Sequence, residues 1–159
     1  MSGYRFLVLA LALLAAAPAT AGDAGARVLE LVNAARAEPR RCGWKRFGAA
    51  PPLVRSTTLD RVAHAHAGDM AARSRMEHAG GDGSTPAERA SRAGYAWMRI
   101  AENVAQGQAT PDEAVASWLK SAGHCANLMD ASYTETGIGV ATTGAGGPYW
   151  AQVFGTPAP

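Results

Sequence analysis

The sequence has little cysteine and little excess charge of either sign. It contains two Cys among 159 residues, and its 15 Lys+Arg are nearly balanced by 13 Asp+Glu. A chain of this length buries enough surface to fold around a hydrophobic core, so neither a disulfide framework nor a metal is needed for folding. The densest basic stretch, Arg36 to Arg46, is short and interrupted by Glu38, which argues against a nucleic-acid partner.

Common metal motifs are also absent from the sequence. It has no H-E-x-x-H, no C-x-x-C and no calcium-binding loop rich in Asp and Gly. His64 and His66 lie two positions apart, and on a helix they point about 200° from each other, so they cannot bind one ion together. We expect His66 to be packed and hydrogen-bonded on the apolar side of its segment, and His64 to be solvated.

No segment is apolar over the roughly 20 residues that a membrane span requires. The apolar run from Phe6 to Ala17 follows Arg5 and precedes Ala19-Thr20-Ala21. A charged start, an apolar middle and an A-x-A site are typical of a secretory signal peptide, which we predict over residues 1–21. We therefore expect residues 22–159 to be exported, to a periplasmic or an extracellular destination, without spanning a membrane.

Export would place the two cysteines in an oxidising compartment. We expect Cys42 and Cys125 to form a disulfide, which in the chain-entropy model stabilises the fold by roughly 4–5 kcal/mol. The alternative is two separate thiols that lie too far apart to bridge, because the sequence does not measure their separation.

Hydrophobic spacing predicts helices in the first two thirds of the mature chain. Residues 24–37 and about 59–74 repeat apolar residues at three- and four-residue intervals. We expect Thr57 or Thr58 to cap the second helix, and residues 40–57 to form a loop between the two helices.

Two further helix starts have the pattern of a capping box. Thr85-Pro86-Ala87-Glu88 and Thr110-Pro111-Asp112-Glu113 each place Thr at the N-cap, Pro at the first helical position and Glu at the third. We expect Gly123 to end the second of these helices, which would place His124 just beyond a helix C-terminus.

The last third of the chain has the pattern of strands. Residues 137–142 and 149–154 alternate around a Gly-rich link, which predicts a β-hairpin. We expect a third strand near residues 98–100, just before Glu102.

Glu102 lies in a largely apolar segment, where a carboxylate needs a cation, a metal or a hydrogen-bond donor. His78 and His124 each follow a helical segment and enter a predicted loop, and loops on a rigid scaffold often carry functional residues. A histidine would serve as the partner of Glu102, and its pKa would then be raised. If both histidines converge on Glu102, the three form either a Zn²⁺ site with an open position or a hydrogen-bonded cluster that ties loops together.

Five blocks of the sequence carry a family resemblance. They are His78, Ala101 to Gly107, Trp118 to Asn127, Gly137 to Val140 and Tyr149 to Phe154. Together they resemble the bacterial branch of the CAP superfamily, which groups cysteine-rich secretory proteins, insect antigen 5 and plant pathogenesis-related proteins. The resemblance implies an α+β fold, a three-layer α-β-α sandwich with a central, mostly antiparallel sheet, formed by residues 22–159 as a single CAP/SCP domain.

The resemblance also implies a cleft lined by two histidines and two acidic residues. His78, Glu102 and His124 match three of these positions, and Ser121 stands where animal members carry the second acid. Ser121 and His124 could form a nucleophile pair oriented by Glu102, which makes these three the candidate catalytic residues. A serine near a helix end is more commonly a hydrogen-bonding residue, and we expect that role here.

We expect a secreted binding protein, rather than an enzyme, whose cleft takes a lipid, peptide or cell-envelope ligand. The alternative is a divalent-metal-dependent hydrolase or peptidase, in which His78 and His124 hold Zn²⁺ and Glu102 acts as a general base. A third hypothesis is a structural or signalling domain in which the polar cluster serves stability alone. We favour the binding protein, because the sequence offers only a modest zinc site and no activated nucleophile.

Overall fold

The computed structural model describes residues 21–143 and 146–159. The signal peptide predicted over residues 1–21 lies outside the described residues, except for Ala21. Within the described ranges, no helix has both the length and the apolar character that crossing a membrane would require.

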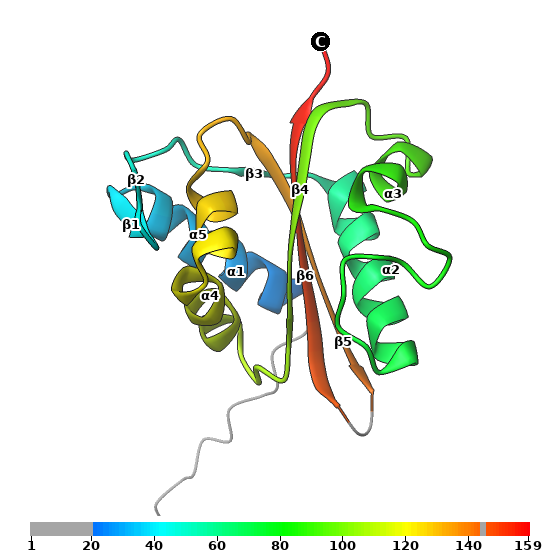
Figure 1. Ribbon diagram of the computed structural model, residues 1–159. Coiled ribbons are helices and arrows are strands. Elements are labelled where there is room, and N and C mark those ends of the chain that lie inside the picture. Colours follow the sequence, from blue (N-terminus) through cyan, green and yellow to red (C-terminus); the bar gives the residue numbers. More distant parts are fainter. Residues whose placement is uncertain (1–20, 144–145) are drawn as a thin grey trace, which may run out of the picture.

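A four-stranded sheet forms the middle layer of the molecule, with helices on both of its faces (Figure 1). The strands, in spatial order, are β3 (Val54–Arg55), β5 (Glu135–Thr143), β6 (Gly147–Pro157) and β4 (Trp97–Gln106). The pairs β5–β6 and β6–β4 are antiparallel, whereas the short β3 joins β5 in parallel.

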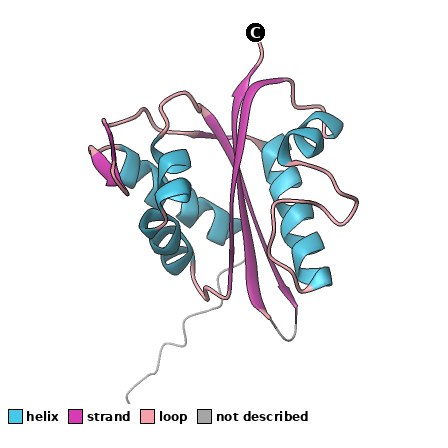
Figure 2. Cartoon of the chain, in the orientation of Figure 1, coloured by secondary structure: helices cyan, strands magenta, loops and turns pink. Residues whose placement is uncertain are grey.

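The helices divide between the two faces of this sheet, as Figure 2 shows in cyan on either side of the magenta strands. One face carries α1 (Ala21–Arg36), α4 (Pro111–Lys120) and α5 (Ala122–Met129). The other face carries α2 (Thr57–Arg73) and α3 (Pro86–Arg92). The expected three-layer α-β-α sandwich with a mostly antiparallel sheet is therefore confirmed.

Each face of the sheet has its own hydrophobic core. Val28, Trp118 and Ile138 belong to the core under α1 and α4, and Leu59 and Met70 belong to the core under α2. Burial of the sheet on both faces explains why β6 is buried continuously from Tyr149 to Gly155.

Two glycines of β5 let α2 lie directly on the sheet. A Cβ atom added at Gly137 would come within 2.0 Å of the backbone carbon of Leu59, and one at Gly139 within 2.3 Å of the backbone nitrogen of His64. The alternation of Gly137-Ile138-Gly139 therefore has a packing reason: Ile138 fills the core of the α1 face, and the glycines accept the helix on the other face.

The predicted helices are present, with small corrections at their ends. The N-cap of α2 is Ser56, not Thr57 or Thr58, because the Ser56 side chain accepts the hydrogen bond from the backbone N–H of Leu59. The capping box at Thr85 is complete. At Thr110 the hydroxyl accepts from the N–H of Glu113 in the same way, but the Glu113 carboxylate accepts from Ala109 instead of returning a bond to the cap.

Two predicted chain segments have more regular structure than expected. The expected loop over residues 40–57 contains an antiparallel hairpin of β1 (Arg40–Cys42) and β2 (Lys45–Phe47), and β3 follows it. The strand predicted near residues 98–100 is β4, which is longer than predicted and includes Glu102. The predicted hairpin of residues 137–142 and 149–154 is confirmed as β5 and β6, although residues 144–145 of its link lie outside the described part.

The expectation that Gly123 ends a helix is wrong. The chain turns two residues earlier, at Ser121, whose backbone is extended with φ −86° and ψ 124°, and this residue ends α4 and begins α5. Gly123 lies in the first turn of α5, so His124 belongs to a helix and not to a loop.

The predicted disulfide between Cys42 and Cys125 is confirmed, with a Cα–Cα separation of 5.4 Å. It joins β1 to α5, and both cysteines are buried in a small apolar cluster with Met129. The bond therefore fastens the β1–β2 hairpin to the helix that carries His124.

Candidate functional site

The centre of the candidate site is the buried carboxylate of Glu102 on β4. Its side chain is 1% exposed, and both of its oxygens are engaged. Oε1 lies 2.9 Å from Nδ1 of His78, and Oε2 accepts a hydrogen bond of 2.7 Å from Nη2 of Arg89. The structure thus brings His78 to Glu102, and it adds a permanent cation that the sequence analysis did not identify.

Arg89 reaches Glu102 from α3, whose start is fixed by the capping box of Thr85 and Glu88. Its Nη1 also donates to the carbonyl of Ser84, so the guanidinium is held from two sides. A buried carboxylate needs a compensating group, so the apolar surroundings of Glu102 were the signal that a cation such as Arg89 lies beside it.

His66 is the second residue that the sequence analysis did not place in this cluster. As expected, it is buried on α2 and hydrogen-bonded, with Nε2 donating to the carbonyl of Glu77 at 2.9 Å. Burial lowers the pKa of His66, which favours the neutral ring, and the carbonyl of Glu77 can only accept, which assigns the proton to Nε2. The 3.6 Å approach of Nε2 to Glu102 is therefore a polar contact and not an ion pair. His64, expected to be solvated, is half-buried.

His78 has the opposite electrostatic behaviour. Its hydrogen bond to Glu102 raises its pKa, although partial burial and the charge of Arg89 oppose the shift. Its side chain is 53% exposed, whereas that of Glu102 is almost wholly covered. With Nδ1 directed to the carboxylate, Nε2 is the ring atom that His78 can offer to a ligand.

His124 lies close enough to His78 for the two to interact electrostatically. Partial burial lowers its pKa, and the positive charge on His78 lowers it further. Two asparagines position this turn of α5: Nδ2 of Asn103 donates to the carbonyl of His124 at 3.0 Å, and Nδ2 of Asn127 donates to Oδ1 of Asn103 at 2.9 Å. The lowered pKa favours the neutral form of His124, whereas the raised pKa favours the protonated form of His78.

Ser121 is the fourth residue that was assigned to the cleft. It stands at the junction of α4 and α5, and its hydroxyl makes no cap hydrogen bond to α5. Among the described residues no hydrogen bond joins Ser121 to His124, so the described contacts give no support to the predicted nucleophile pair. An unassisted serine hydroxyl is a weak nucleophile.

The same residues do not fit the zinc site of a hydrolase. Across residues 21–143 and 146–159, no three His, Cys, Asp or Glu side chains are gathered so that they could hold a metal ion. His78 and His124 would supply two ligands, and Glu102 has both oxygens committed to His78 and Arg89. A catalytic zinc ordinarily has three protein ligands.

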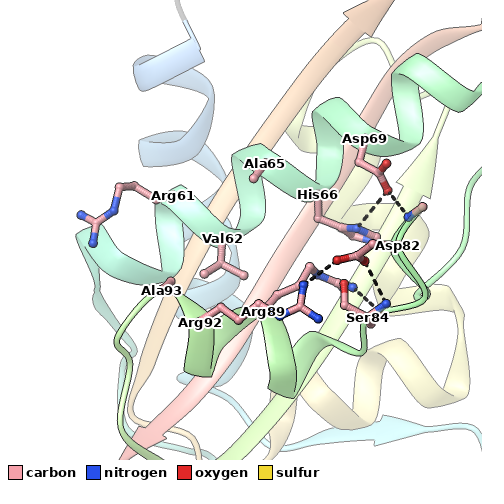
Figure 3. Close-up of a pocket in the computed structure, with 12 residues that line it drawn as sticks. Arg61, Val62, Ala65, His66, Asp69, Asp82, Ser84, Arg89, Arg92 and Ala93 are labelled. Atoms are coloured by element: carbon pink, nitrogen blue, oxygen red, sulfur yellow. Dashed lines mark hydrogen bonds and ion pairs between the residues drawn. The ribbon is translucent and has the colours of Figure 1, made fainter.

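A cavity of about 430 Å³ opens between α2 and α3, beside this cluster (Figure 3). His66 and Arg89, which contact Glu102 on one side, line the cavity on the other. Its remaining lining residues are apolar, charged or small: Arg61, Val62, Ala65, Asp69, Gly80, Gly81, Asp82, Ser84, Arg92 and Ala93. None of the four predicted cleft residues lines this cavity. The cavity adjoins the cleft through His66 and Arg89, which contact Glu102.

Comparison with known proteins identifies the family of this chain. The model of the cysteine-rich secretory protein family, CAP, matches residues 29–154. The uncharacterized protein YkwD of Bacillus subtilis is 30% identical over 138 residues, which cover 87% of this chain and 49% of that protein. This chain thus spans about half the length of the curated relative it matches.

Two solved structures share the fold. An extracellular protein with an SCP domain from Bacillus anthracis has a TM-score of 0.71 at 22% identity, with 88% of this chain and 45% of that chain covered. An outer surface protein from Borrelia burgdorferi has a TM-score of 0.67 at 20% identity, with coverages of 84% and 89%. On the extent of the family match, the chain belongs to the CAP family of cysteine-rich secretory proteins.

Proposed function

We propose that this chain is an exported binding protein that takes a lipid, peptide or cell-envelope ligand at the cleft of His78, Glu102, Ser121 and His124, and that it catalyses no reaction there. The observation that carries the proposal is the state of Glu102. Its two oxygens are held by His78 and Arg89, and its side chain is buried.

A carboxylate in this state is poorly suited to act as a general base. A base must reach the proton that it abstracts, and Glu102 would have to leave two charged partners to do so. Protonation of Glu102 would also leave Arg89 as a cation without its counter-ion, which is costly at a buried position. The arrangement is better suited to holding His78 in one orientation.

The group that the cleft offers to a ligand is the exposed ring of His78. The positive charges of Arg89 and protonated His78 outnumber the single negative charge of Glu102. A ligand with a phosphate or carboxylate group would therefore gain a charge-assisted hydrogen bond from Nε2 of His78. Neutral His124 beside it supplies a second polar contact without adding repulsion.

Export is supported by the disulfide and by the family. The Cys42–Cys125 bond is typical of proteins that mature in an oxidising compartment. The similar solved structures include an extracellular protein and an outer surface protein. Periplasmic and extracellular destinations share these features.

The proposal is tested by ligand titration followed by NMR. The protein is purified in its exported form. It is then titrated with dihexanoylphosphatidylglycerol and, separately, with a muropeptide. We expect the His78 ring resonances to shift with one of the two compounds, and His78→Gln to weaken that binding at least fivefold. His64→Gln is the matched control, because it changes a histidine that lies on α2 and outside the cleft, and it should bind as the unchanged protein does.

The hydrolase alternative is tested on the same samples. Zinc is titrated into the protein by calorimetry, and the muropeptide and casein are followed for cleavage with and without zinc. Zinc-dependent turnover that is lost in both His78→Gln and His124→Gln would overturn the proposal.

A second candidate position for the ligand is the cavity between α2 and α3, because it is hollow and reaches His66 and Arg89. Ala65 lines the cavity from an exposed position on α2, so Ala65→Phe fills the space with little effect on the core. Loss of binding in Ala65→Phe with retention in His78→Gln would move the ligand to the cavity.

A further inference from the structure

The β1–β2 hairpin carries an exposed tryptophan at its tip. Trp44 is 86% exposed, the largest value among the exposed large hydrophobic residues of the described chain. It occupies the second position of a two-residue turn, after Gly43, whose φ of +61° is typical of the first position in a type II′ turn. A tryptophan gains stability from burial, so one held at the tip of a turn is placed for an external contact.

Basic side chains surround this tryptophan. The hairpin contains Arg40, Arg41, Lys45 and Arg46, and none of them forms an ion pair within the described residues. Lys45 is close enough to Asp130 to help lower the pKa of that carboxyl. The hairpin is therefore a local concentration of positive charge.

Two of the arginines face each other directly. The register pairs Arg41 with Arg46, and both are exposed, whereas the neighbouring pair of Cys42 and Lys45 contains the buried cysteine of the disulfide. Like charges opposite each other destabilise an antiparallel pair. An anionic partner on this outer face would relieve that repulsion.

The hairpin is also held rigidly. The disulfide joins Cys42 to α5, and the turn packs so closely on α5 that a Cβ at Gly43 would lie 2.9 Å from Cβ of Ala122. On the inner side, Phe47 packs against the disulfide cluster, and Nζ of Lys45 lies 4.7 Å from the centre of the Phe47 ring. A rigid surface loses little conformational entropy when it binds.

We propose that this hairpin docks the protein on a membrane surface rich in anionic phospholipid, with Trp44 entering the interfacial layer and Arg41 and Arg46 facing the headgroups. Tryptophan is favoured at the boundary between headgroups and acyl chains, and basic residues are attracted to anionic lipid surfaces. A strand of nucleic acid is a poorer fit, because the hairpin offers a single exposed aromatic ring and not the series on which successive bases stack.

The docking surface is separate from the cleft and adjoins it. Cys125 follows His124 on α5, so the same disulfide that holds the hairpin lies next to the cleft. Figure 1 shows β1 and β2 beside α5, on the side of the sheet away from α2 and α3. Docking through the hairpin would therefore keep the cleft near the bilayer, whatever ligand the cleft takes.

Vesicle binding of the secreted protein tests this inference. We expect sedimentation with vesicles of equimolar phosphatidylglycerol and phosphatidylcholine, no sedimentation with phosphatidylcholine alone, and release by high salt. Arg41→Gln/Arg46→Gln should lower the partition coefficient roughly 25-fold, since each basic residue near such a surface contributes about fivefold. Trp44→Ala should also weaken binding, and brominated acyl chains should quench the fluorescence of the unchanged protein but not of this variant.

Controls separate a loss of docking from a loss of folding. Arg27→Gln/Arg75→Gln removes the same charge from other exposed positions and should bind vesicles like the unchanged protein. Arg41→Gln/Arg46→Gln should melt no lower than the unchanged protein, because it removes a repulsion. Equal vesicle binding by the two double variants, or no binding by the unchanged protein, would overturn the inference. Binding in the cleft of whichever compound shifts the His78 resonances should persist in Trp44→Ala, so the two proposals fail separately.

Discussion

Replacement of Arg89 by Met tests the electrostatic account of the buried cluster. The change removes the cation 2.7 Å from a carboxylate whose side chain is 1% exposed, while Arg89 itself is 11% exposed. Because both groups are well covered, the pair counts as buried, and breaking such a pair by removing one partner costs about 3–5 kcal/mol. The cost falls on Glu102, which keeps its charge with only His78 to balance it. The unfolding free energy of Arg89→Met should therefore drop by an amount in this range.

The assay is urea unfolding of the secreted protein at neutral pH, followed by tryptophan fluorescence. The matched variant is Arg89→Met/Glu102→Gln, which removes both charges. It should be more stable than Arg89→Met alone, because the uncompensated carboxylate is gone. If Arg89→Met lost less than about 1 kcal/mol, or if the double variant were less stable than the single one, the burial argument for this pair would be refuted.

Three further predictions concern other parts of the molecule. The raised pKa of His78 contributes stability that is full below about pH 6.5 and is lost as the pH rises through that pKa, so His78→Gln should flatten the stability profile of urea unfolding above pH 6.5. Gly139→Ala should lower the unfolding free energy by about 3 kcal/mol, because its Cβ meets the backbone of α2 and no side chain can yield; an unchanged melting temperature would contradict the packing. Reduction of the Cys42–Cys125 bond should cost roughly 4–5 kcal/mol, measured by urea unfolding with and without dithiothreitol, and a loss below 1 kcal/mol would argue against it.

The features that the sequence predicted correctly are those set by local chemistry. Thr85 and Thr110 cap their helices because the signal lies within four consecutive residues, and the β5–β6 hairpin follows from alternation around a Gly-rich link. The β1–β2 hairpin was missed because its strands are three residues long and mostly basic, so hydrophobic alternation has no room to develop. The prediction that Gly123 ends a helix was wrong because a glycine that follows one helix can also lie in the first turn of the next.

The candidate site was only partly predictable for a different reason. The demand of Glu102 for a partner follows from its apolar surroundings, and His78 meets it. Arg89 and His66 come to the same carboxylate from α3 and α2, and such convergence depends on how the helices pack on the sheet and not on any local pattern. His124 depends on Ser121, since the turn at that residue decides whether the histidine lies in a loop or in a helix.

The glycines of β5 influence the polar cluster around Glu102, although they do not contact it. They set the height of α2 above the sheet, and α2 carries His66, which reaches across to Glu102 on β4. A methyl group at Gly137 or Gly139 would lift the helix, and the imidazole would rise with it, away from the carboxylate. Gly137 and Gly139 thus keep α2 close to the sheet because they have no side chains. The geometry of the charged cluster at Glu102 on β4 therefore depends on two glycines of β5.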